Sequence, residues 1–226
     1  MLDKVKGGLI VSCQALPEEP LHSSFIMGRM ALAADQGGAV GIRANTASDI
    51  HEIEKNTKLP IIGIVKRDYE GTPIYITPTM KEIEELAETS CAMIALDATD
   101  RVRFQGQKLE EFIKEARTLV PDKLLMADIA TLDEAIRAEQ LGFDCVSTTL
   151  MGYTEQSQGH NIADNDFERL KEILKAVQIP VIAEGHVDTP AKARRCIEIG
   201  AHAVVSGGAI TRPQLITKAF VEAMRG

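Results

Sequence analysis

Eight short apolar runs, each followed by a segment of helical periodicity, recur along this chain of 226 residues. Most of the runs are apolar at successive positions, without strict alternation, which is typical of parallel strands buried on both faces. They occupy residues 9–13, 39–42, 61–65, 92–96, 124–127, 145–148, 181–183 and 203–206. Eight strands that alternate with helices predict a (β/α)8 barrel, a TIM barrel of α/β class, as a single domain over residues 1–226.

The segments between the runs carry helix signals. Thr79 and Thr131, each with a glutamate three residues further on, match the capping box. Thr77-Pro78 and Thr189-Pro190 each place a proline just inside an expected helix start. The chief rival is an open flavodoxin-like or Rossmann sheet, which is weakened because no GxGxxG follows the first run.

Composition excludes several classes of partner. The net charge of -8 argues against nucleic acid as a partner, although it permits a small anionic ligand held by local Lys and Arg. No run is long enough to span a membrane, and the N-terminus has no signal-peptide pattern. The four cysteines lie far apart without a CxxC, which indicates small buried residues in a reducing compartment. These features predict a cytoplasmic protein.

Polar residues follow the apolar runs, where a barrel of this kind gathers its active site at the C-terminal ends of the strands. An apolar barrel does not need most of these side chains for folding. They are Gln14, Arg43, Lys66, Asp97, Asp128, Thr148 or Thr149, Glu184, and Ser206 to Gly208.

Lys66 and Glu184 each follow a strongly apolar run. Lys66 is either a solvated strand end or a functional amine, and a mouth lined with carboxylates favours the functional interpretation. A desolvated lysine has a lowered pKa and serves as a base or a Schiff-base nucleophile. Glu184 is either a structural ion-pair partner of Lys66 or Arg43, or an acid/base or orienting group, and these roles overlap.

Arg43 and Asp128 are further candidates at strand ends. Arg43 has a planar fork suited to carboxylate or phosphate, and its alternative is an exposed loop arginine. Asp128, like Asp97, either orients sugar hydroxyls or pairs with Lys66. Two such aspartates also suit a metal, but the five histidines are scattered, so no metal is expected. Asp188, close to His186, is expected to cap a helix instead.

A phosphate site is predicted after the last two runs. Gly185, Gly207 and Gly208 let backbone N–H groups approach an anion closely, and Arg212 adds charge at the start of the last helix. An ordinary tight turn would explain Gly-Gly alone, but the placement on strands 7 and 8 favours phosphate. The polar stretch 152–164 suits a loop over the barrel mouth, where Tyr153 binds phosphate, closes the site or packs the loop.

Six motifs together carry a family resemblance. They are Val11-Ser12-Cys13-Gln14-Ala15, Gly41-Ile42-Arg43-Ala44, Gly63-Ile64-Val65-Lys66-Arg67, Ala127-Asp128-Ile129-Ala130-Thr131, Gly152-Tyr153-Thr154 and Ala183-Glu184-Gly185-His186. The chain resembles, over essentially its whole length, the N-acylglucosamine-6-phosphate 2-epimerases, the N-acetylmannosamine-6-phosphate epimerases of bacterial sialic acid catabolism.

The resemblance implies a (β/α)8 barrel that interconverts N-acetylmannosamine 6-phosphate and N-acetylglucosamine 6-phosphate, with no redox cofactor and no metal. It implies that Lys66 and Glu184 are the catalytic pair. Substrate contacts then fall on Gln14, Arg43 and Asp128, and the phosphate side on Gly185, Gly207, Gly208 and Arg212. It also favours a homodimer, for which apolar surface on helices such as residues 25–34 is available.

Three rival interpretations stay open. Lys66 could form a Schiff base in an aldolase- or lyase-type barrel that acts on a phosphorylated keto acid. The same pocket could belong to a sugar-phosphate sensor without turnover, which intact Lys66 and Glu184 disfavour. A metal-dependent pentose-phosphate epimerase is weaker still, because no set of histidine ligands recurs on the strands.

Overall fold

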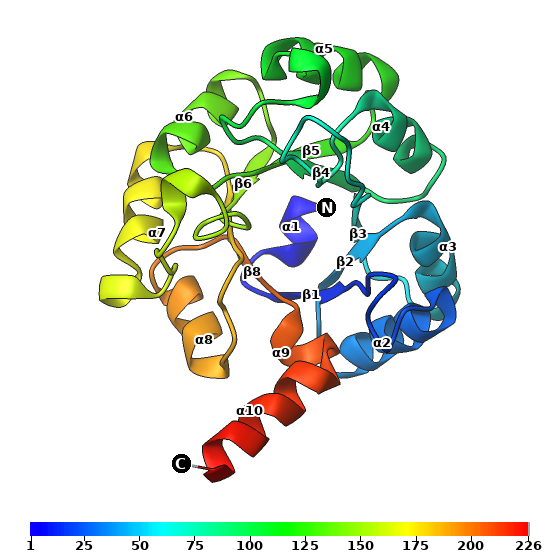
Figure 1. Ribbon diagram of the computed structural model, residues 1–226, viewed down its shortest axis with the longest axis vertical. Coiled ribbons are helices and arrows are strands. Elements are labelled where there is room, and N and C mark those ends of the chain that lie inside the picture. Colours follow the sequence, from blue (N-terminus) through cyan, green and yellow to red (C-terminus); the bar gives the residue numbers. More distant parts are fainter. Residues whose placement is uncertain (226) are drawn as a thin grey trace.

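The computed structural model describes residues 1–225, and within them eight parallel strands pair in chain order to close a barrel. The ring closes where β8 pairs with β1, with Val204 opposite Leu9. The strands are β1 (Leu9–Cys13), β2 (Gly41–Asn45), β3 (Ile61–Ile64), β4 (Met93–Asp97), β5 (Leu124–Asp128), β6 (Cys145–Ser147), β7 (Val181–Ala183) and β8 (Ala203–Ser206). Figure 1 shows this barrel at the centre of a ring of helices. The predicted (β/α)8 fold is confirmed.

The ring consists of seven helices, one after each of the first seven strands. They are α2 (Ser24–Gln36), α3 (Ala47–Asn56), α4 (Met80–Ala87), α5 (Leu109–Leu119), α6 (Leu132–Gln140), α7 (Asp164–Ala176) and α8 (Pro190–Glu198). Both predicted capping boxes form, at Thr79 and Thr131. Thr189 caps α8 as expected, because its hydroxyl accepts from the backbone N–H of Lys192 at 3.2 Å. Two short 3₁₀ turns, η1 (Phe104–Gly106) and η2 (Glu155–Ser157), lie in loops.

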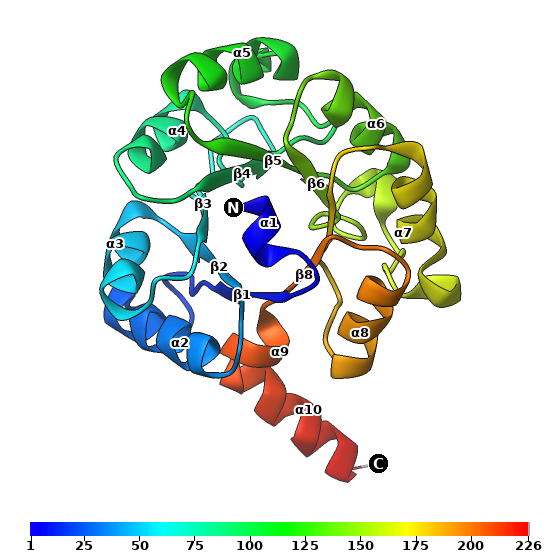
Figure 2. The same ribbon diagram turned by 180° about the vertical axis from the view of Figure 1, so that it is seen from behind.

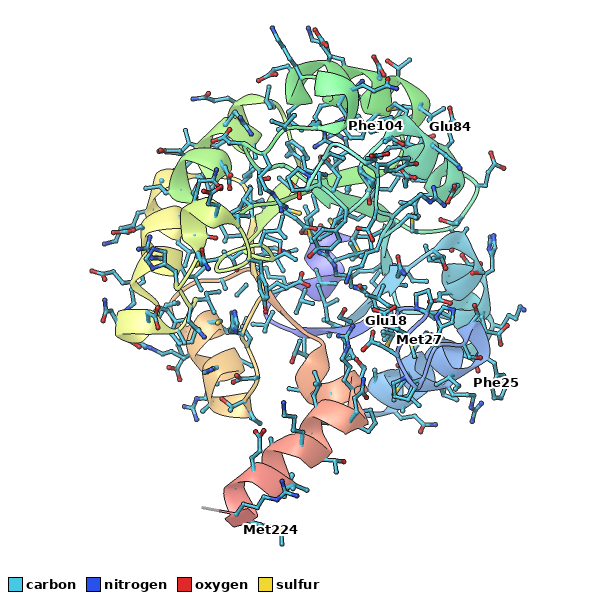
Figure 3. All side chains as sticks on the ribbon, in the orientation of Figure 1. Glu18, Phe25, Met27, Glu84, Phe104 and Met224 are labelled. Atoms are coloured by element: carbon cyan, nitrogen blue, oxygen red, sulfur yellow. The ribbon has the colours of Figure 1, made fainter. Side chains whose placement is uncertain are left out.

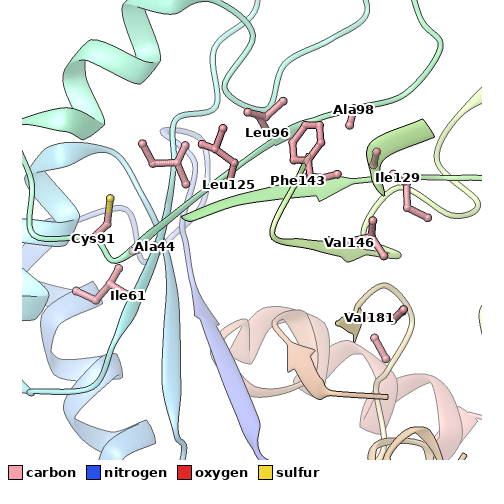
Figure 4. Close-up of a cluster of buried hydrophobic side chains, with 14 of the residues drawn as sticks. Ala44, Ile61, Cys91, Leu96, Ala98, Leu125, Ile129, Phe143, Val146 and Val181 are labelled. Atoms are coloured by element: carbon pink, nitrogen blue, oxygen red, sulfur yellow. The ribbon is translucent and has the colours of Figure 1, made fainter. Parts of the chain in front are cut away.

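Apolar side chains form two layers, one on each side of the strands. The outer layer packs strands against helices and includes Ala44, Cys91 and Val181 (Figure 4). The inner layer fills the barrel and includes Ile62 and Met126, both inaccessible to solvent. Every strand except β2 therefore contributes apolar side chains to both layers, which explains why most runs do not alternate with polar residues. All four cysteines are free and buried, as predicted.

A short N-terminal helix, α1 (Leu2–Val5), is a feature that the sequence did not predict. It lies in the middle of the ring in both views (Figures 1 and 2), at the end of the barrel where the chain enters β1. Val5 is completely buried in the inner apolar layer, and His202 binds the carbonyl oxygen of Leu2 at 3.0 Å. The helix therefore plugs the end of the barrel opposite the C-terminal ends of the strands.

The C-terminal segment departs from the ring. After β8 the chain forms the single turn α9 (Gly208–Thr211) and then α10 (Pro213–Arg225), which projects away from the barrel in Figures 1 and 2. None of the residues of α10 is buried, and Met224, labelled in Figure 3, is 85% exposed. No helix within residues 1–225 combines the length and apolar character that crossing a membrane requires.

Three local expectations are corrected by the structure. The second strand begins at Gly41 and continues to Asn45, so Arg43 lies within the strand and not at its end. Thr77 caps no helix; it is completely buried and donates to the carbonyl oxygen of Ala95 at 2.7 Å. Asp188 is not a cap either, because Thr189 holds that position and Asp188 pairs with Lys192 at 2.8 Å.

Candidate active site

A cavity of about 680 Å³ opens at the C-terminal ends of the strands. It brings together residues from β1, β2 and β8 and from the segments that follow β1, β3, β6, β7 and β8. Its polar lining consists of Ser12, Gln14, Arg43, Lys66, Tyr75, Thr149, Tyr153, Glu184, His186, Asp188, Ser206 and Arg212, with Gly185, Gly207 and Gly208 between them. Of the candidates at the strand ends, Asp128 and Asp97 do not lie on the cavity wall, and Asp97 is buried and pairs with Arg101 instead of with Lys66.

Asp128 lies behind Arg43 and not on the cavity wall. Its Oδ1 and Oδ2 accept from Nη1 and Nη2 of Arg43 at 3.0 and 2.6 Å, and both side chains are at most 1% exposed. The Asp128 carboxylate thus fixes the guanidinium fork, which is the strongest geometry for this pair. The Nε of Arg43 is buried and has no partner within residues 1–225.

Glu184 is the second carboxylate bound to Arg43, at 3.0 Å between Oε2 and Nη1. The same oxygen accepts from the hydroxyls of Thr149 at 3.1 Å and Ser147 at 3.3 Å. Its backbone is held by Thr148, whose hydroxyl accepts from the N–H of Glu184 and donates to its carbonyl oxygen. Burial raises the pKa of the Glu184 carboxyl, while the charge of Arg43 opposes that change. The expected ion pair of Glu184 therefore forms with Arg43.

Lys66 follows β3 and is fixed through its backbone. Its N–H donates to the side-chain oxygen of Asn45 at 2.8 Å, and it forms an antiparallel bridge with Ile76. Its amine, by contrast, has neither a hydrogen bond nor an ion pair to any residue in the described part of the chain, 1–225. Desolvation, and secondarily the charges of Arg43 and Arg212, lower the pKa of Lys66 to about 8. Lys66 is thus a cavity-facing amine that is mainly protonated at pH 7 but has a much larger neutral fraction than an ordinary lysine.

The loops after β7 and β8 are tightly packed where the glycines stand. Gly185 has φ +90°, and a Cβ there would lie 3.3 Å from the carbonyl oxygen of Thr148. A Cβ on Gly207 would lie 3.2 Å from Cβ of Ser12. Ser206 joins the two loops by donating to the carbonyl oxygen of Val187 at 2.9 Å. A side chain at either of these glycines would therefore crowd its protein neighbours, and both glycines line the cavity, where an anion site uses residues of this kind.

Tyr153 lies on the loop over the cavity, as predicted, and is 56% exposed. Its ring stacks on the ring of His186 with a centroid distance of 5.0 Å and an interplanar angle of 5°. His186 has φ +55°, a conformation uncommon for a residue with a side chain. The stack therefore joins the loop after β6 to the loop after β7 at the mouth of the cavity.

Several cavity residues were not predicted from the sequence. Ser12 lies inside an apolar run, and Tyr75 lies on an irregular segment without a strand or helix signal. Leu215, Ile216, Ala219 and Phe220 of α10 also line the cavity, and only the apolar pattern of that helix could have indicated them. Within residues 1–225, no group of three or more His, Cys, Asp or Glu side chains is arranged to hold a metal ion.

The fold and the cavity define a (β/α)8-barrel enzyme with an amine and a carboxylate at the ends of its strands. A family model described as "Putative N-acetylmannosamine-6-phosphate epimerase" matches residues 27–226. A relative from Oceanobacillus iheyensis, named as a putative N-acetylmannosamine-6-phosphate 2-epimerase, is 61% identical over 98% of this chain and 100% of its own length. A relative of the same name from an Enterobacter species is 60% identical over 99% of this chain and 95% of its own.

A solved structure of the N-acetylmannosamine-6-phosphate 2-epimerase from Clostridium perfringens has a TM-score of 0.94 and 58% identity. The match covers 99% of this chain and 96% of that one. The chain therefore belongs to the N-acetylmannosamine-6-phosphate 2-epimerase family, and the resemblance seen in its motifs is confirmed.

Proposed function

We propose that this protein inverts C2 of N-acetylmannosamine 6-phosphate to give N-acetylglucosamine 6-phosphate, as an isomerase of sialic acid and amino sugar catabolism. The observation that carries the proposal is the unpaired amine of Lys66, with a pKa near 8, in one cavity with the Arg43–Glu184 pair. An amine with a pKa near the working pH is suited to remove a proton next to a carbonyl group.

The chemistry follows from the position of C2 beside the aldehyde in the open-chain sugar. Lys66 removes the C2 proton, and the electron pair of that bond moves onto the carbonyl to give an enolate. Arg43 and Gln14 stabilise the enolate oxygen, and each well-placed donor contributes ~3 kcal/mol. A proton returned to the opposite face of C2 inverts the centre.

Glu184 has two candidate roles in the return of the proton. It acts as acid/base on the opposite face, which its raised pKa supports, or it orients the substrate while a substrate hydroxyl relays the proton. Activity retained in Glu184→Gln would favour the orienting role, because the glutamine amide still forms hydrogen bonds but cannot transfer a proton as an acid or a base. Asp128, behind Arg43, contributes by holding the guanidinium in place.

The phosphate group occupies the loops of strands 7 and 8 in this proposal. The backbone N–H groups of Gly185, Gly207 and Gly208 face the anion, and Arg212 adds a positive charge. Tyr153 covers the mouth. Binding of the phosphate, which is remote from C2, fixes the reacting carbon against Lys66.

Proton NMR of N-acetylmannosamine 6-phosphate with the metal-free protein in D2O tests the reaction directly. Deuterium at C2 together with the N-acetylglucosamine epimer is the expected result. Binding without exchange would instead support a sugar-phosphate sensor. Failure to bind, combined with borohydride trapping of Lys66 on a phosphorylated keto acid, would support the Schiff-base alternative.

We further infer that the protein is a cytoplasmic homodimer in which a second copy covers α10. The support is that Phe220 and Met224 are 69% and 85% exposed on a helix without any buried residue. Phe220 and Met224 are four positions apart and so lie on one face of the helix, and neighbouring exposed apolar side chains support an interaction site there. A phosphorylated sugar is a cytoplasmic metabolite, and the four unpaired cysteines suit a reducing compartment.

Size-exclusion chromatography with light scattering measures the mass of the protein in solution and so tests whether it is a dimer. The wild type is expected to have the mass of a dimer, and Phe220→Glu is expected to shift it to a monomer. Phe25→Glu is the matched control, because Phe25 on α2 is also exposed, at 66%, but lies on a different helix (Figure 3). A dimer lost in Phe25→Glu and kept in Phe220→Glu would place the interface on α2 instead.

A further inference from the structure

Arg212, which the proposed function places beside the phosphate, is held by a carboxylate on the opposite side of its guanidinium. Its Nε and Nη2 donate to Oε1 and Oε2 of Glu19, the latter at 3.0 Å. The remaining nitrogen, Nη1, is turned toward Gly207 and lies 3.9 Å from the place where a Cβ on that glycine would be. Glu19 thus occupies one edge of the Arg212 guanidinium, and the remaining nitrogen faces the loop after β8 that contains Gly207.

Glu19 is itself fixed by the loop between β1 and α2. Its Oε2 accepts from the N–H of Leu16 at 2.9 Å, and its Oε1 accepts from the side chain of Gln214 at 3.2 Å. Glu19 and Arg212 are 16% and 21% exposed. This carboxylate therefore has a defined position from which it can hold a long and otherwise flexible side chain.

We propose that Glu19 is a positioning residue, which orients Arg212 so that Nη1 points at the substrate phosphate. The inference rests on the phosphate site of the proposed function. Arginine has many rotamers, and an arginine that is already held in its binding conformation loses less entropy when it binds the anion. The bidentate contact selects one orientation of the planar fork, which a single hydrogen bond does not.

The negative charge of Glu19 also repels a phosphate, so the two effects of this residue have opposite signs. Arg212, the N–H of Leu16 and the amide of Gln214 all face the carboxylate and offset its charge. We therefore expect orientation to dominate, so that loss of Glu19 weakens phosphate binding even though it removes a negative charge. If Glu19 merely competed with phosphate for Arg212, its loss would instead strengthen phosphate binding.

The test compares four variants of the whole protein, namely Glu19→Gln, Arg212→Ala, their double variant and Glu18→Gln. Calorimetry gives the Kd of inorganic phosphate, and steady-state kinetics gives KM and kcat for N-acetylmannosamine 6-phosphate. Glu18→Gln is the matched control, because Glu18 (Figure 3) is exposed and contacts no residue of the described chain by hydrogen bond or ion pair. It removes the same charge from the adjacent position.

Glu19→Gln is expected to raise the Kd of phosphate and the KM about five- to tenfold, while kcat changes less than about twofold. Glu18→Gln is expected to change neither. In the Arg212→Ala background, Glu19→Gln is expected to have no further effect, because Glu19 acts only through Arg212. A structural role in stability alone would not produce that dependence on Arg212.

Unchanged or tighter phosphate binding in Glu19→Gln would overturn the proposal, and so would an equal loss in the presence and absence of Arg212. Failure of the underlying phosphate site has a different signature. In that case Arg212→Ala itself leaves both the Kd of phosphate and the KM unchanged, and the positioning role falls together with the site.

Discussion

Arg43 binds Asp128 through both terminal nitrogens, with Nη1 3.0 Å from Oδ1 and Nη2 2.6 Å from Oδ2. Because Asp128 uses both oxygens and is inaccessible to solvent, it holds the arginine from behind. The cavity therefore faces a guanidinium whose orientation is set before any ligand binds. Such preorganised donors stabilise developing negative charge without a cost of reorganisation.

Asp128→Ala is expected to destabilise the fold by about 3–5 kcal/mol, because it leaves a buried guanidinium without its main partner. Urea unfolding measures this loss. Glu198→Ala, which breaks an exposed pair with Arg194 at 2.7 Å, is the control and should change the free energy of unfolding little by comparison. An equal loss of stability in the two variants would show that Glu184 alone is sufficient to balance the buried charge of Arg43.

Lys66→Ala is expected to abolish turnover and leave the fold intact. The amine has no hydrogen bond or ion pair within residues 1–225, so its removal breaks no such contact, while the base for C2 is lost. Deuterium exchange at C2 reports the chemistry, and circular dichroism reports the fold. Near-normal exchange in this variant would remove Lys66 from the mechanism.

The pH dependence of kcat/KM should follow the Lys66 amine. Its pKa is lowered to about 8, and only the neutral form accepts a proton. The rate is therefore expected to rise about tenfold per pH unit below that value and to level off above it. Rates measured between pH 6 and 9.5 check this, and a flat profile across that range would exclude the amine as the essential base.

Lys66 should also reduce the stability of the folded state near neutral pH. Its pKa falls from 10.5 to about 8 on folding, so the unfolded chain binds its proton more tightly. The resulting loss in the free energy of unfolding is largest below pH 8. It decreases between pH 8 and pH 10.5 and is absent above pH 10.5. Lys66→Met is expected to gain about 1–3 kcal/mol at pH 7 and much less at pH 10.5. Urea unfolding at both pH values measures this difference. A gain in stability that did not depend on pH would mean that the methionine stabilises the fold by packing and not by removing the charge.

Sequence patterns were sufficient to predict the barrel and the position of most of its candidate site residues at the cavity. Barrel strands are buried on both faces, so their apolar runs stand out, and the first polar residue after a run must lie at the mouth. Lys66 and Glu184 were found in this way. The glycines after β7 and β8 were found because close backbone approach needs a residue without a side chain.

Other parts of the site depend on contacts between distant segments and leave no local signal. Glu19 and Arg212 are separated by 193 positions, and only the closed barrel brings them together. Tyr75 reaches the cavity from an irregular segment, whose course is set by hydrogen bonds such as Thr77 to Val65 at 2.8 Å. The bounds of the second strand differed most, predicted at 39–42 and found at Gly41–Asn45, because pairing with neighbours, more than residue type, fixes where a strand starts and stops.

Arg212→Ala is expected to raise KM about 10- to 100-fold, with a much smaller change in kcat. In the proposed function Arg212 binds the phosphate, which does not change during the reaction, so its hydrogen bonds should contribute similarly to the ground state and the transition state. A charged hydrogen bond contributes ~1.5–3 kcal/mol, which corresponds to this change in KM. Arg194→Ala, on the exposed face of α8, is the control and should leave KM unaltered. A fall in kcat alone would mean that Arg212 acts near C2, and the phosphate would then have to lie elsewhere in the cavity.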